Sequence, residues 1–315
     1  MHRSSLRGPL SAAPLPVLLP LLLSACGPAP LERPDGAVIQ ANADRYMDGR
    51  IAKLTTRDGW LTLVGLFWLP EGESTMGSAP GNSFVYDAPG VPPLLGTFTL
   101  TRGPERAVVR FDAADGVQIL SGESEPVSFA MLTGDGGGPV YLQHGSLKWH
   151  VIQRDERLAV RLQDADSPIR TEFDGIERFP VTGEWWVPAR FVWNQPPDTI
   201  EVPNILGTIG RTPSPGSVEF EVNGDLFRLD LWKDSDDTVN FFTAFADETN
   251  GASTYGGGRF LWVDAPDAQG RTVVDFNRAY NPPCVFTEFA TCPLPPRQNR
   301  LALQVEAGEK VWGKH

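Results

Sequence analysis

Short apolar segments that recur about every 8–12 residues constrain the fold of this chain more than any other feature. From Trp60 onward, segments such as TFTLT, AVVRF and SVEFEV are bounded by Gly, Pro, Asp or Asn, and the chain contains 32 Gly and 29 Pro. Most of these segments are rich in β-branched and aromatic residues, as strands are. The sequence therefore predicts an all-β protein with two packed sandwich-like or barrel-like domains, at residues 37–165 and 166–315.

Three local signals refine this prediction. The segment AVIQANADRYMDGRIAKLTT has apolar residues at loosely helical intervals and no proline, so we place one helix at about residues 37–53 with Asp35 as its N-cap. The dense apolar run at residues 60–69 is interrupted by Gly65, which predicts two short strands or one bulged strand. Asn223-Gly224 stands between two apolar segments and predicts a hairpin turn.

The N-terminus has the features of an export signal. Arg3 and Arg7 precede an apolar run that ends in LLPLLLSAC, and we predict a signal peptide at residues 1–25. The run is too short, and too interrupted by proline, to be a membrane-spanning helix.

The four residues at the end of this run resemble the lipobox of bacterial lipoproteins. In that family the cysteine, here Cys26, receives the lipid and becomes the first mature residue; the alternative is a chance cysteine after an ordinary secretory signal. Residues 26–36 then form a Gly- and Pro-rich tether. We expect a lipid-anchored protein on the extracytoplasmic side of the cell envelope, and Gly27 favours the outer membrane over the inner one because it is not the aspartate that retains lipoproteins.

The charge of the mature chain disfavours nucleic acid as a partner. Removal of residues 1–25 leaves 27 − 2 = 25 basic against 39 acidic residues, a net charge of 25 − 39 = −14, and such a surface repels phosphate backbones. The chain has no P-loop, Rossmann glycine pattern, HExxH or GxSxG motif. We therefore expect no cofactor and no metal, and the identity of any protein partner stays open.

Cys284 and Cys292 are the cysteines that remain after the lipid attachment site. In an oxidising compartment such a pair tends to form a disulfide, which we predict here. Two buried thiols or a metal pair are the alternatives.

Polar residues concentrate between residues 255 and 310. Asp275 and Asn277 share one face of a predicted strand because the side-chain period of a strand is two. Upstream, a glycine run in TYGGGRF can let the backbone approach a partner closely. We predict a pocket for a small polar or envelope-derived ligand, lined by Tyr255, Arg259, Asp275, Asn277, Tyr280 and Asn281.

A structural role for the same residues is the alternative. Asp275 and Asn277 could instead satisfy backbone amides of the proline-rich loop, and Arg259 could form an ion pair with Asp247 or Asp275. Trp185 and Trp186 are adjacent on a predicted strand, so one should lie in the core and the other should face outward or line a groove.

Two other functions remain open. A hydrolase would use Asp275 or Glu288 with His150 or Tyr255 as acid and base. A structural envelope scaffold would need none of these residues and would instead expose an apolar patch.

The chain is similar to the bacterial domain-of-unknown-function family 1684 in four motifs, namely GLFWLPEGESTMGS, GGGRFLWVDAP, DFNRAYNPPCVFTEFATCPLPPRQNRL and AGEK. This resemblance covers the mature chain after the tether, and it implies an all-β protein that is often secreted or lipid-anchored, without identified site residues.

The segment STMGSAPGNSFVYD more faintly resembles the forkhead-associated sandwich. The resemblance implies a sandwich fold for the N-terminal half. Ser78 stands where that family has arginine and a downstream Ser-x-x-His is missing, so phosphopeptide binding is not expected.

Overall fold

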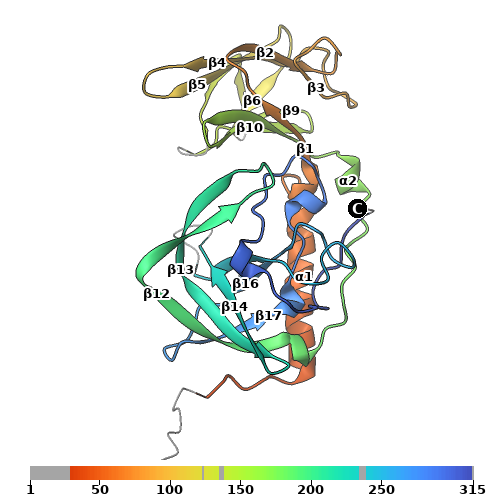
Figure 1. Ribbon diagram of the computed structural model, residues 1–315. Coiled ribbons are helices and arrows are strands. Elements are labelled where there is room, and N and C mark those ends of the chain that lie inside the picture. Colours follow the sequence, from red (N-terminus) through yellow and green to blue (C-terminus); the bar gives the residue numbers. More distant parts are fainter. Residues whose placement is uncertain (1–28, 123, 135–137, 234–238, 314–315) are drawn as a thin grey trace, which may run out of the picture.

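The computed structural model describes residues 29–122, 124–134, 138–233 and 239–313, which form two β domains stacked end to end and one long helix (Figure 1). The predicted all-β class is confirmed. The predicted signal peptide and Cys26 lie outside the described residues. No helix in the described part of the chain has the length and hydropathy needed to cross a bilayer.

The N-terminal domain is a sandwich of a six-stranded sheet, in the order β1-β11-β10-β9-β6-β7, and a five-stranded sheet, in the order β3-β2-β4-β5-β8. Its core lies between the sheets, where the rings of Phe111 and Trp149 meet edge to face with 5.4 Å between their centroids. The strands are β1 (Leu63–Trp68), β2 (Gly72–Gly77), β3 (Phe84–Val85), β4 (Gly96–Arg102), β5 (Ala107–Ala113), β6 (Ile119–Ser121), β7 (Glu125–Val127), β8 (Phe129–Leu132), β9 (Leu142–His144), β10 (Leu147–Arg154) and β11 (Arg157–Asp164).

The C-terminal domain combines a four-stranded antiparallel sheet, in the order β14-β13-β12-β17, with the two-stranded pair β15-β16. Phe276 joins the two parts of its core, since its ring centroid lies 5.6 Å from that of Phe220 and 5.4 Å from that of Phe245. The elements are α2 (Pro168–Thr171), η3 (Gly183–Trp185), β12 (Trp186–Pro203), β13 (Ile209–Val222), β14 (Asp225–Leu231), β15 (Phe241–Phe245), β16 (Arg259–Val263), β17 (Arg271–Asp275), η4 (Phe276–Arg278), η5 (Pro283–Val285) and η6 (Arg297–Asn299).

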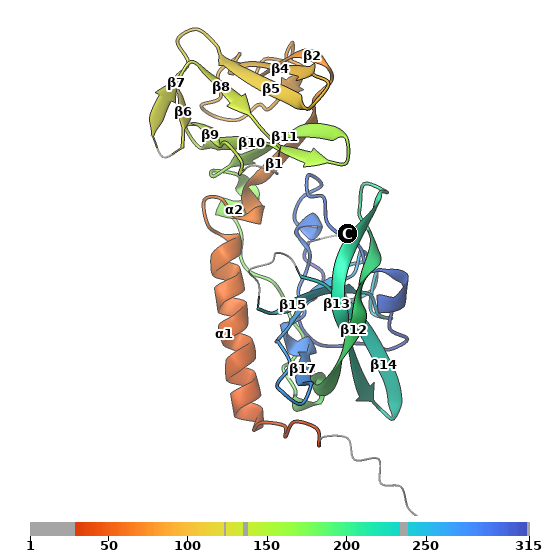
Figure 2. The same cartoon turned by 90° about the vertical axis from the view of Figure 1, so that its left-hand side faces the viewer.

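The helix α1 (Gly36–Leu54) runs beside the C-terminal domain (Figure 2). The Asp35 side chain caps it as predicted, because its Oδ1 accepts a hydrogen bond from Ala37 N at 2.8 Å. The sequence prediction grouped this helix with the N-terminal sandwich, at residues 37–165. The structure corrects that grouping. Helical periodicity identifies the buried side of a helix but not the domain against which this side packs.

Two other local predictions are confirmed. Asn223 and Gly224 both have positive φ, 56° and 87°, and join β13 to β14 in a two-residue turn. The run from residue 60 begins as a 3₁₀ turn, η1 (Trp60–Thr62), and continues as β1, whose pairing with β11 is irregular between Leu63 and Gly65. The strand is therefore bulged, as the glycine indicated.

Candidate functional site

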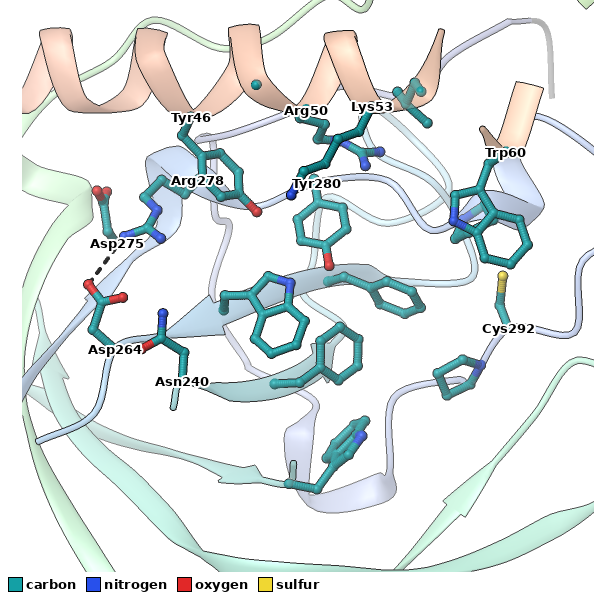
Figure 3. Close-up of a pocket in the computed structure, with 18 of the residues that line it drawn as sticks. Tyr46, Arg50, Lys53, Trp60, Asn240, Asp264, Asp275, Arg278, Tyr280 and Cys292 are labelled. Atoms are coloured by element: carbon teal, nitrogen blue, oxygen red, sulfur yellow. Dashed lines mark hydrogen bonds and ion pairs between the residues drawn. The ribbon is translucent and has the colours of Figure 1, made fainter. Parts of the chain in front are cut away.

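A cavity of about 1090 Å³ lies beneath α1 (Figure 3). The C-terminal domain forms most of its wall, and side chains of the N-terminal domain contribute at one end. Its volume is just above the usual range for ligand pockets in proteins, about 300–1,000 Å³. Because residues from both domains and the helix line it, the cavity exists only in the assembled chain.

One face of α1 forms the roof of this cavity. The roof residues recur three or four positions apart, which places them on the same side of a helix. From Asn42 to Lys53 the helix rises about 16 Å, so the cavity is elongated rather than round. The roof consists of Asn42, Arg45, Tyr46, Gly49, Arg50 and Lys53.

Four aromatic side chains form the floor, namely Trp232, Phe242, Phe260 and Trp262. Phe242 lies at the centre, with ring centroids 5.1 Å from Trp232, 4.9 Å from Phe260 and 5.2 Å from Trp262. Phe260 and Trp262 are two positions apart on β16, and Phe242 is the direct partner of Trp262 on β15, so all three project from the same face of this pair of strands.

Polar side chains gather at the end of the cavity near the start of α1, and Figure 3 shows Asp264, Asp275 and Arg278 there beside Asn240. We call this the polar end. Arg278 Nη1 donates to Asp264 Oδ2 at 3.4 Å, and its guanidinium lies 4.8 Å from the ring centroid of Tyr46. Burial raises the pKa of Tyr46 to about 12, so its hydroxyl remains a hydrogen-bond donor at neutral pH.

The opposite end lies at the junction of the two domains, where Trp60 and Cys292 line the cavity (Figure 3). Arg154 Nε and Arg161 Nη2, from β10 and β11, reach across the junction and donate to Thr291 Oγ1 at 3.0 Å and 3.4 Å. These contacts tie the N-terminal sandwich to the loop that follows Pro283.

An ion pair fixes the roof to the C-terminal domain. Arg50 Nε donates to Glu309 Oε1 at 2.5 Å, and Arg50 Nη2 donates to the carbonyl of Asn281 at 2.8 Å. Glu309 Oε2 accepts a hydrogen bond from Asn281 N at 2.7 Å, and its side chain is 1% exposed. A second ion pair, between Arg178 and Asp44, holds the other side of the helix.

Comparison with known proteins defines the larger part of this site. The family model described as "Protein of unknown function (DUF1684)" matches residues 171–310. These residues belong to the DUF1684 family. The match contains the floor, the polar end and Glu309, whereas α1 and the sandwich strands lie before it.

One solved structure similar to this chain is the solution NMR structure of an uncharacterized protein of Haloarcula marismortui. It has 28% sequence identity and covers 45% of this chain and 78% of the archaeal one, with a TM-score of 0.38. A search of curated proteins finds no match. The forkhead-associated resemblance of the N-terminal half stays a prediction.

Of the six residues predicted to form a pocket, Asp275 and Tyr280 line the cavity beneath α1. Burial raises the pKa of the Asp275 carboxyl, which accepts hydrogen bonds at Oδ1 from Asn277 N at 3.2 Å and from Asn277 Nδ2 at 2.9 Å. Burial also raises the pKa of Tyr280. The hydroxyl of Tyr280 is therefore a neutral donor.

Arg259, Asn277 and Asn281 lie instead in the interior of the DUF1684 domain and do not line the cavity. The Arg259 side chain is fully buried, pairs with Asp247 and donates to the carbonyl of Val305 at 2.8 Å. Burial lowers its pKa. Asn277 Nδ2 donates to the carbonyl of Thr182 at 3.0 Å, while Asn281 Nδ2 donates to the carbonyl of Lys310 at 2.7 Å. The Arg259–Asp247 ion pair is the one that the structural alternative named, whereas Asn277 bonds to Thr182 rather than to the proline-rich loop.

The two cysteines of the DUF1684 domain are free and buried, so the predicted disulfide is not formed in this structure. Cys284 N donates to Cys292 Sγ at 3.1 Å. The hydrogen bond between the two thiols lowers the pKa of Cys284 and raises that of Cys292, while Tyr255 hydrogen-bonds to Cys284. Tyr255 therefore belongs to this cluster rather than to the cavity lining.

The acid–base partners predicted for a hydrolase lie on separate parts of the fold. His150 is on β10 of the N-terminal sandwich, with its ring 4.7 Å from that of Tyr141. Asp275 ends β17 in the DUF1684 domain, and Glu288 is exposed. Among the described residues, no group of three or more His, Cys, Asp and Glu is placed to hold a metal ion.

Sequence reasoning found part of the polar end but missed the roof and the floor. Trp185 is buried and Trp186 lines the cavity, as predicted, although Trp185 ends the 3₁₀ turn η3 and only Trp186 is on a strand. The cations Arg45, Arg50 and Lys53 recur at helical spacing, a signal that was available in the sequence. The aromatic floor gave no comparable signal, because its residues follow the ordinary pattern of core strands.

Proposed function

We propose that the protein binds an amphiphile, a molecule with an extended apolar part and a polar group, in the cavity beneath α1. The observation that carries the proposal is the elongated aromatic floor, which has carboxylates beside a guanidinium at the polar end and faces basic side chains along the roof. Aromatic surface favours the burial of hydrocarbon. Convergent polar side chains orient a ligand.

Binding accounts for the lining better than catalysis does. The described lining contains no serine and no histidine, and its thiol, Cys292, lies at the end opposite the carboxylates Asp264 and Asp275. These groups are therefore not placed as the contacting nucleophile and base that acyl transfer requires. Asp275 is its buried carboxylate, and its neighbour Asn277 occupies Oδ1. A hydrolase is the second candidate, supported only by the raised pKa of this carboxyl.

The cellular setting is part of the same proposal. The sequence of residues 1–26 supports export and a lipid anchor on Cys26. A protein held at the envelope surface would meet amphiphiles of the membrane, which fits a cavity with an aromatic floor and charged side chains around it. We place it on the extracytoplasmic side, with the outer membrane favoured in a Gram-negative cell.

The test uses the mature chain, residues 26–315, with Cys26→Ser. Four of the nine tryptophans line the cavity, namely Trp60, Trp186, Trp232 and Trp262. An acyl chain carrying bromine should therefore quench a large part of the protein fluorescence when it occupies the cavity. We expect saturable quenching below the critical micelle concentration, together with stabilisation of about 2.7 kcal/mol at a hundred times the dissociation constant.

Gly49 offers a variant that blocks the cavity without disturbing the fold. It lies in the roof, and a Cβ added there meets nothing within 4 Å, so Gly49→Leu should fill the cavity while improving helix propensity by about 0.5–1 kcal/mol. Ala52→Leu, on the exposed side of α1, is the matched control. We expect Gly49→Leu to weaken binding by about tenfold or more, or about 1.4 kcal/mol. Equal binding by both variants, or no binding by the wild type, would refute the proposal.

A further inference from the structure

The polar end has a composition that specifies the kind of polar group it can hold. Its two carboxylates, Asp264 and Asp275, stand beside the guanidinium of Arg278 from η4 and the amide of Asn240. This end therefore carries groups of both signs. An anionic group would face the two carboxylates and a cationic group would face Arg278, whereas a neutral group that both donates and accepts hydrogen bonds can use all four side chains.

At this end of the cavity, some donor and acceptor atoms are available to hydrogen-bond such a group. The bond from Arg278 Nη1 to Asp264 Oδ2, at 3.4 Å, is long for a charge-assisted hydrogen bond, which is about 2.7–2.9 Å. The hydrogen bonds described for Asp275 go to Oδ1. Asp275 Oδ2 is thus an available acceptor in a residue that lines the cavity. Tyr46, whose ring lies against the Arg278 guanidinium, also lines the cavity and has a neutral hydroxyl.

Indole surface lies directly beside these polar atoms. Trp186 on β12 is the cross-strand partner of Asp275 on β17, and both line the cavity. Direct partners on neighbouring strands have side chains on the same face, about 4.5–5.5 Å apart at Cβ. An aromatic face next to a carboxylate and a guanidinium matches a sugar ring, whose C–H face is apolar and whose hydroxyls each donate and accept.

We propose that the polar end binds the uncharged, hydroxyl-rich headgroup of a glycolipid-like amphiphile. The sugar ring lies against Trp186, and its hydroxyls bond to Asp264, Asp275 and Arg278. The apolar chain then runs over the floor toward Trp60 and Cys292, where Leu54, Pro283 and Pro293 also line the cavity beside Arg154 and Arg161, which donate to Thr291. This inference rests on the proposed function and names its ligand class.

The experiment compares three probes with the same saturated chain, each below its critical micelle concentration: an alkyl glucoside, the alcohol and the fatty acid. Binding to residues 26–315 with Cys26→Ser is measured by calorimetry. We expect the glucoside to bind about tenfold or more tighter than the alcohol and the fatty acid, since each well-made buried polar contact changes an equilibrium constant by about that factor.

Variants then assign the preference to the polar end. Arg278→Gln and Asp264→Ala should reduce the affinity for the glucoside to that of the alcohol while leaving the alcohol affinity unchanged. Arg271→Gln removes a guanidinium on the neighbouring β17, which pairs with Asp267 and does not line the cavity, and should change neither affinity. Loss of glucoside binding in Arg271→Gln as well would contradict the assignment.

The outcomes separate this inference from the proposed function. If all three probes bind but the glucoside has no advantage, or if the fatty acid binds best, the headgroup assignment is wrong and the amphiphile site stands. If none of the probes binds to the wild type, the proposed function is wrong too.

Discussion

Replacing Arg259 with methionine should destabilise the protein by about 3–5 kcal/mol. Both side chains of the Arg259–Asp247 ion pair are fully buried, so loss of the guanidinium leaves the charge of Asp247 in the interior without its partner. The carbonyls of Val305 and Ala307 also lose a charged donor. Unsatisfied buried acceptors cost further free energy, which puts the expected loss in the upper part of this range.

Thermal unfolding of the mature chain measures this loss. About 1 kcal/mol shifts the midpoint of a domain of 150–250 residues by about 2–4 °C, so Arg259→Met should lower it by about 10 °C. Arg271→Gln is the matched control, because it breaks an ion pair whose side chains are 31% and 33% exposed and should cost less than about 1 kcal/mol. The double variant Arg259→Met/Asp247→Asn should lose less than the sum of the two single variants, since the two groups interact directly.

If Arg259 instead serves as a ligand-binding residue, the opposite result is expected. A guanidinium that serves a ligand is dispensable for folding, so Arg259→Met would then unfold within about 1 kcal/mol of the wild type and would lose only its affinity for the amphiphile. That result would show that the residue belongs to a binding site and would refute our assignment of it to the core.

Three further predictions concern the roof, the polar end and the thiols. Glu309→Gln removes the charge that holds Arg50, so amide hydrogen exchange in α1 should become faster while the N-terminal sandwich is unchanged; equal exchange rates would show that the pair does not fix the helix. Burial raises the folded-state pKa of Asp275 above its unfolded value of about 3.9, so its contribution to stability is fully present below that unfolded value and is lost as pH rises through the folded pKa. The advantage of Asp275→Asn over the wild type in urea unfolding should therefore grow from about pH 4 to pH 7, and a constant difference would contradict this sign. Because Cys284 N already lies 3.1 Å from Cys292 Sγ, mild oxidation should join the two thiols in a disulfide and stabilise the fold by about 2–3 kcal/mol. Thiol titration of the oxidised protein after unfolding should then find neither cysteine free, and two free thiols would contradict this prediction.

The parts of the fold that sequence could predict are those determined by neighbours in the chain. Asp35 caps a helix two residues away, and Asn223-Gly224 reverses the chain within two residues. The cavity depends instead on residues far apart in sequence. Its roof ends at Lys53 and its floor begins at Trp232. The periodicity of either segment does not show that the two lie next to each other in space.

The polar stretch from residue 255 to residue 310 was interpreted as a site because buried ion pairs and binding pockets use the same residue types. Arg259, Asn277 and Asn281 form hydrogen bonds with backbone carbonyls that no sequence pattern locates. Burial distinguishes the two roles, and burial is a property of the assembled fold. Asp275 and Tyr280 face the cavity although they stand only a few residues from these interior groups.

The interior polar groups nevertheless serve the cavity indirectly. Asn281 and Glu309 form the hydrogen-bonded anchor for Arg50, and Arg259 begins the strand that carries Phe260 and Trp262. The DUF1684 match at residues 171–310 includes this anchor and the floor but begins after α1. The family domain therefore supplies the floor and the point of attachment, whereas α1 supplies the roof. A chain that begins at residue 60 would leave Phe242, Phe260 and Trp262 without the helix that covers them, and it should therefore lose the affinity for the amphiphile that the intact protein has.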